Sequence, residues 1–132
     1  MSSTNYYNTL IEVAPDCPKQ QGCPALKPDT IAGVQLELLK SRPYELTSDD
    51  LLFEVHRRRS AADTGLSRDQ FFAKSQACLR ASPLSKQLGW GTHHDAEGKV
   101  ALVGVESPEY SALQQDPAVT KVSAMRNKRA NK

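Results

Sequence analysis

The sequence has no apolar run that approaches the roughly 18 residues of a membrane span. Its first residues, MSSTNYYNTLIEV, lack the basic start and apolar core of a signal peptide. Only three cysteines occur among 132 residues, and this odd number argues against a secreted disulfide scaffold. These absences favour a cytoplasmic protein with reduced thiols, whose length suits one domain with its own core.

Strong charge of one sign is also missing from most of the chain. The formal net charge is +2, but residues 117–132 carry five cations and no acid. The rest has 12 basic and 15 acidic residues, so the body is mildly acidic. This pattern excludes a uniformly cationic nucleic-acid binder and leaves only weak, non-specific nucleic-acid contact through the basic tail.

The common signatures of nucleotide and hydrolase sites, GxGxxG, the P-loop, GxSxG and HExxH, are absent as well. Cys17 and Cys23 lie six positions apart in a proline-rich loop. A zinc site needs closer spacing and a second matching pair, which the sequence does not offer. We therefore expect no metal and no cofactor, and we assign these two cysteines no role.

Three strands are predicted from alternation and turn residues. Residues 5–13 alternate, with Tyr7, Thr9 and Ile11 on one side. Residues 90–95 and 99–105 read as a hairpin, because the four residues between them start with Asp and end with Gly. Such a tight turn requires antiparallel pairing.

Five helices are predicted from capping residues at their N-termini. They begin at Thr30 (or Asp29), Thr47 (or Ser48), Ser67, Ser82 and Ser107. Ser67 with Gln70 forms a capping box, and Ser82 and Ser107 are each followed by proline, which suits the first helical position. For the second helix, a strand over residues 51–56 is an alternative because LFEVH alternates.

These elements predict an α+β fold in two layers, with a small, mostly antiparallel sheet and three or four helices packed on one face. The sheet would contain residues 5–13, 90–95 and 99–105, with residues 77–80 at an edge. We expect a single domain over residues 1–116. Residues 117–132 are polar, basic and weakly periodic, so we expect them to form a disordered tail.

The segment around the only tryptophan holds the candidate ligand-binding residues. Arg80 presents a planar fork of donors suited to carboxylate or phosphate, and the helix start at Ser82 adds unpaired N–H groups. Trp90 would supply a flat wall. His93 and His94 point to opposite faces of their strand, and His94 lies on the same side as Trp90.

The sequence thus predicts a non-catalytic binding domain for a small anionic ligand or a protein partner, with Arg80, Ser82, Trp90 and His94 at its site. The plainer interpretation is packing, with Arg80 paired to a local carboxylate. An enzyme that uses Cys78 with His94 is the rival, although nothing in the spacing shows that the two meet. The oligomeric state is not predicted.

Several strings carry a resemblance: TNYYNTLIEVAPDCP, TSDDLLFEV, CLRASPL, GWG, DAEGKVAL and GVESPEY. With them, residues 4 to 113 resemble a family of bacterial and fungal proteins that is catalogued as a domain of unknown function (family six-one-five-seven). The resemblance implies a single-domain architecture and no particular activity, cofactor or partner. Cys23 is not part of the pattern.

Overall fold

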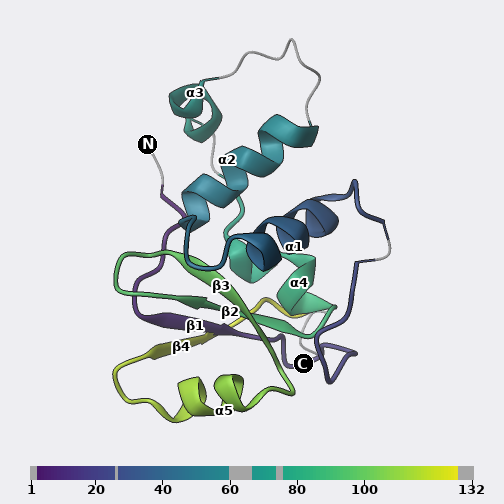
Figure 1. Ribbon diagram of the computed structural model, residues 1–132, viewed down its shortest axis with the longest axis vertical. Coiled ribbons are helices and arrows are strands. Elements are labelled where there is room, and N and C mark those ends of the chain that lie inside the picture. The colour runs from purple at the N-terminus through teal and green to yellow at the C-terminus, as the bar shows by residue number, and fades with distance from the viewer. Residues whose placement is uncertain (1–2, 26, 60–66, 74–75, 128–132) are drawn as a thin grey trace, which may run out of the picture.

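A four-stranded sheet with the strand order β3-β2-β1-β4 forms the centre of the computed structural model, which describes residues 3–25, 27–59, 67–73 and 76–127 (Figure 1). The strands are β1 (Thr9–Glu12), β2 (Trp90–His94), β3 (Val100–Gly104) and β4 (Thr120–Ser123). β2 pairs antiparallel with β1 and β3, whereas β4 runs parallel to β1. The predicted α+β class with a mostly antiparallel sheet is confirmed.

The helices begin at the predicted capping residues. They are α1 (Ile31–Ser41), α2 (Ser48–Arg59), α3 (Arg68–Phe72), the 3₁₀ turn η1 (Leu79–Ala81), α4 (Pro83–Lys86) and α5 (Pro108–Gln115). Ser67 and Gln70 form the full capping box. Residues 51–56 lie within α2, so the strand alternative is wrong. Leu51 and Val55 are one helical turn apart, and both are buried.

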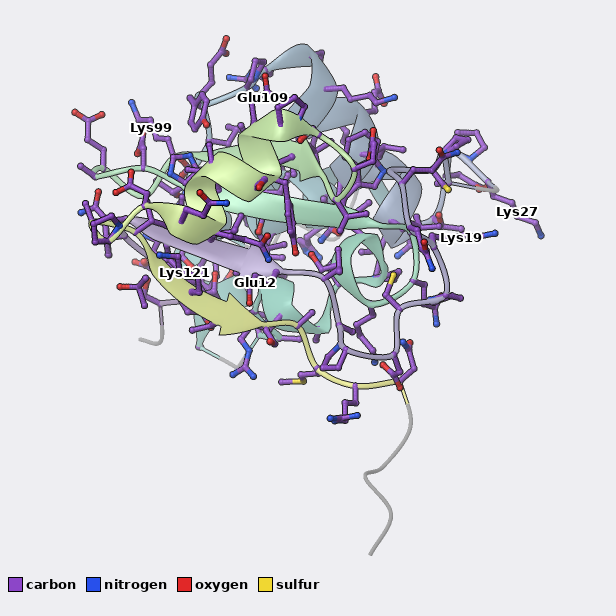
Figure 2. The ribbon with its side chains drawn as sticks, turned by 90° about the horizontal axis from the view of Figure 1, so that it is seen from below. Glu12, Lys19, Lys27, Lys99, Glu109 and Lys121 are labelled. Atoms are coloured by element: carbon purple, nitrogen blue, oxygen red, sulfur yellow. The ribbon has the colours of Figure 1, made fainter. Side chains whose placement is uncertain are left out.

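The two faces of the sheet are covered by different helices. Figure 1 shows α1, α2 and α4 on one side of the sheet and α5 on the other. Ile11 packs into the larger core cluster with α1 and α2, and Leu10 packs into a smaller one with Tyr110 of α5. In Figure 2, seen from below, Glu12 and Lys121 lie on the α5 side. Gln114 of α5 accordingly donates to Glu12.

The prediction of an edge strand at residues 77–80 is wrong, because Leu79–Ala81 forms the turn η1. This segment lies beside the end of β4 and outside the ladder. The backbone N–H of Met125 donates to the Arg80 carbonyl (2.9 Å). The Arg80 Nε donates in turn to the Ser123 carbonyl (2.6 Å).

The expectation of a disordered tail from residue 117 is also wrong for residues 119–124, since β4 is a sheet strand. Val119 and Ala124 are buried, and Val122 packs against the larger core. Lys121 points to the other side, where its Nζ donates to the Asp116 carbonyl. The cations at 128, 129 and 132 lie outside the described residues.

No helix in the described part of the chain is both long and apolar enough to cross a membrane.

Because β4 buries apolar side chains, deleting residues 117–132 should destabilise the protein strongly. Removing Val119, Val122 and Ala124 exposes the edge of β1 and both core clusters, so we expect the melting temperature to fall by at least ~10 °C. Deleting residues 128–132 alone keeps β4 and is the matched control, with an expected shift of no more than a few degrees. Thermal unfolding followed by circular dichroism measures both, and equal melting temperatures would contradict the structural role of β4.

Candidate functional site

A pocket of about 370 Å³ opens between α1, α2, α3 and the segment that leads into α4. We call it the α1–α2 pocket. Its lining residues are Ile31, Gln35, Leu52, Val55, His56, Arg59, Phe71, Gln76, Ala77, Cys78, Ala81, Ser82 and Pro83. Its volume lies in the range of small-molecule sites.

Most of the lining is apolar. Leu52, Val55 and Phe71 line it from α2 and α3, and Ala77, Ala81 and Pro83 line it from the segment before α4. Ile31 begins α1 and remains 47% exposed although it is a large apolar residue. The described walls are therefore largely apolar, and Ile31 lies where the pocket meets solvent.

The polar side chains that line the described part of the pocket are neutral or basic rather than acidic. Arg59 ends α2 and is exposed, and its Nε donates to the Asp29 carbonyl (3.1 Å). Gln35 lies deep, with 2% of its surface exposed. No Asp or Glu occurs among the described residues that line the pocket. The described lining therefore includes the cation Arg59 without a carboxylate to neutralise it.

Ser82 connects the start of α4 to α1. Its Oγ accepts from the backbone N–H of Leu84 (3.1 Å), as an N-cap does. The same hydroxyl donates to Gln35 Oε1 at 2.6 Å. The helix start at Ser82 is thus already capped from within, and its side chain faces α1.

Cys78 lines the same pocket through a half-buried side chain. Its Sγ lies 3.3 Å from the Tyr6 hydroxyl, and either atom can donate the hydrogen bond. Burial raises the pKa of Tyr6 to about 12, the Cys78 contact adds to the rise, and the Arg80 guanidinium opposes it. Tyr6 therefore stays protonated at neutral pH and able to donate.

The four predicted site residues do not line one pocket in the described part of the chain. Ser82 lines the α1–α2 pocket, whereas Arg80 holds the end of β4 through the Ser123 carbonyl. Trp90 contacts the proline-rich loop, because its Nε1 donates to the Cys23 carbonyl (2.8 Å). Lys40 of α1 lies over the Trp90 ring. The anion corner at Arg80 stays a prediction.

Two residues that line the pocket, Gln35 and Arg59, are not among those predicted from the sequence. A signal for Gln35 was present: it lies one helical turn after Ile31 and one before Leu39, a polar residue on the inner side of α1. Arg59 belongs to a run of three arginines. Its neighbours Arg57 and Arg58 pair with Glu54, and the sequence alone does not distinguish the three.

A second hollow lies between the proline-rich loop and the end of α4, lined by residues that include Asp16, Lys19 and Cys23. Here Asp16 accepts hydrogen bonds from the backbone and side chain of Asn127. These hydrogen bonds connect the segment that follows β4 to the proline-rich loop. We therefore assign the residues around this hollow a structural role.

Over residues 1–130 the sequence matches the Family of unknown function (DUF6157). The chain belongs to this family. No curated protein and no solved structure matches it. The DUF6157 match confirms the resemblance inferred from the sequence strings.

Among the described residues of this DUF6157 chain, no three His, Cys, Asp or Glu side chains lie close enough together to hold a metal ion.

His94 lies in the core of the sheet with no exposed surface. Its Nε2 is 3.1 Å from Thr92 Oγ1, and its Nδ1 has no hydrogen-bond partner. The ring of Tyr6 meets it edge-on at 5.4 Å between centroids. Tyr6 thus contacts both His94 and Cys78, but the structure has no hydrogen bond from the imidazole to the thiol.

Stability should therefore depend on pH through His94. Burial lowers the pKa of His94 to about 4, with His93 adding to the effect and Asp95 opposing it. Since the unfolded chain takes up this proton near pH 6.5, the free energy of unfolding should fall as the pH drops from about 6.5 to 4, by on the order of 3 kcal/mol. Urea unfolding at several pH values measures the decline.

His94→Gln should remove most of this pH dependence. His93→Gln on the same strand is the comparison and should remove a smaller part, because burial also lowers the pKa of the half-buried His93, while Asp95 and Asp116 oppose the fall. An NMR titration of the wild-type imidazoles provides a direct reading, and a His94 pKa near 6.5 would contradict the buried, neutral ring.

Proposed function

We propose that this protein is a non-catalytic binding domain for a small anionic ligand with an apolar body, which occupies the α1–α2 pocket. The observation that carries the proposal is the lining itself. Its described walls are apolar, and its polar groups include the cation Arg59 and the buried amide of Gln35 but no carboxylate.

The position of Arg59 supports an anionic group at the rim of the pocket. Arg59 is exposed at the end of α2, and its Nε bond to Asp29 holds the guanidinium beside the start of α1. A guanidinium has five N–H donors, so donors remain for a carboxylate or phosphate after this bond. An anion with an apolar chain would place its charge there and its chain against Leu52, Val55 and Phe71.

The contacts of His94 favour binding over catalysis by Cys78. A cysteine nucleophile needs a base within hydrogen-bond reach of its sulfur. His94 Nε2 instead meets Thr92, and the neighbour of Cys78 Sγ is the Tyr6 hydroxyl. The accessory nucleic-acid role of the tail stays a prediction, because three of its five cations lie outside the described residues.

Isothermal calorimetry with decanoate tests the proposal, with decanol and inorganic phosphate as the two partial probes. Decanoate should bind, decanol should bind more weakly, and phosphate should not bind measurably, because both the apolar walls and the cation contribute. Arg59→Gln should lower the affinity for decanoate about five- to tenfold, because one exposed hydrogen bond to a charged group is lost.

Arg57→Gln is the matched control, since Arg57 pairs with Glu54 and does not line the pocket. Arg80→Ala separates the two candidate positions. If decanoate binding is lost in Arg80→Ala and kept in Arg59→Gln, the ligand binds at Arg80, the position predicted from the sequence. Equal binding of decanoate and decanol, or no binding of either, would contradict the proposed function.

A further inference from the structure

A buried carboxamide faces the α1–α2 pocket. Gln35 lies in α1 with only 2% of its surface exposed, and it belongs to the pocket lining. Its Oε1 accepts the Ser82 hydroxyl at 2.6 Å. Gln35 is therefore a polar residue at the inner part of a pocket whose walls are mostly apolar.

The N-cap of α4 determines which end of this carboxamide meets Ser82. Ser82 Oγ already accepts the backbone N–H of Leu84, so its single proton needs an acceptor. Gln35 Oε1 supplies that acceptor. If the amide were turned around, its NH₂ group would donate to Ser82 Oγ and the hydroxyl proton would lose its partner. The N-cap therefore directs Nε2 of Gln35 away from Ser82.

Among the described residues, the side-chain hydrogen bond of Gln35 is the one that its Oε1 accepts from Ser82, and none is donated by its Nε2. Nε2 is not one of the fully buried side-chain atoms that lack a partner, so its N–H groups are open to the pocket that Gln35 lines. Since Gln35 lines the pocket, an occupant of the pocket is placed to accept from these groups.

We infer that the ligand carries, besides its anionic group, a carbonyl on its apolar body that accepts from Gln35, so that the ligand class is an apolar oxo-carboxylate. This inference rests on the proposed function and names its ligand more narrowly. Gln35 is then the residue that determines specificity, and Ser82 is the positioning residue that orients it.

The choice of a carbonyl follows from the same hydrogen bonds. A second charged group at this depth would lose its hydration beside apolar walls, while the cation Arg59 lies at the exposed rim. A hydroxyl would also accept from Nε2, but its own proton would in turn need an acceptor, and the described walls of the pocket are mostly apolar. A carbonyl needs donors only, and Nε2 of Gln35 supplies them.

Calorimetry with chain-matched probes tests this inference. We would compare decanoate with oxodecanoates that carry one ketone at successive positions, and each ketone with the hydroxydecanoate of the same position. At the position that meets Gln35, the ketone should bind about tenfold more tightly than its hydroxyl counterpart, because a site built from buried donors discriminates against an unmatched group.

Gln35→Met keeps the size of the side chain and removes its N–H donors, so the preference for the ketone should disappear. Ser82→Ala should reduce the preference, because the amide is then able to turn its oxygen toward the ligand. The ratio of the two affinities is the readout, since a merely structural role of either residue would change both affinities together.

The outcomes separate the two proposals. If decanoate binds but no ketone is preferred in the wild-type protein, this inference is wrong and the proposed function stands. If the preference persists in Gln35→Met, Gln35 is not its source and the inference is again wrong. If no probe binds, the proposed function fails and the inference fails with it. If a variant does not fold, the comparison of the ketone and hydroxyl probes in the wild-type protein decides.

Discussion

Both faces of the strand β1 are buried, and the arrangement of the other strands and helices follows from this burial. Leu10 and Ile11 are neighbours in sequence, point to opposite faces and have no exposed surface. β1 also has a strand on each side, β2 antiparallel and β4 parallel. Such a strand needs neighbours on both faces and along both edges. The helices α1, α2 and α4 lie on one face and α5 lies on the other, while β2 and β4 pair with the two edges (Figure 1). The elements that surround β1 therefore come from segments far apart in the sequence.

The short segment from Cys78 to Ser82 links this constraint to the candidate site. Arg80 fastens the end of β4 from one side, through the Ser123 carbonyl. Two residues later Ser82 caps α4 and donates to Gln35 of α1. Cys78 lies between the Tyr6 hydroxyl and the α1–α2 pocket. Side chains that stabilise the sheet and side chains that line the pocket thus come from the same short segment. The orientation of the Gln35 amide follows from the N-cap of α4.

The sequence predicted features that depend on neighbouring residues and missed those that depend on distant ones. Helix starts such as Ser67 with Gln70 were predictable because a cap and its partner lie three positions apart. β4 was missed because its pairing with β1 spans more than 100 residues, and its one apolar residue, Val122, follows the cation Lys121. Arg80 and Ser82 were placed in a site, but the sequence does not show that Arg80 turns to β4 and Ser82 to Gln35. The pocket was missed because its walls come from four separate elements.

The most direct test of the account is whether decanoate protects Cys78 from a thiol reagent. Cys78 lines the α1–α2 pocket, whereas Cys17 and Cys23 do not, so the protein contains its own controls. The native protein is alkylated with iodoacetamide, and the rate at each cysteine is measured by mass spectrometry of peptides. With decanoate at about ten times its Kd, alkylation of Cys78 should slow about tenfold while Cys17 and Cys23 keep their rates. An unchanged rate at Cys78, or equal slowing at all three cysteines, would contradict binding in this pocket.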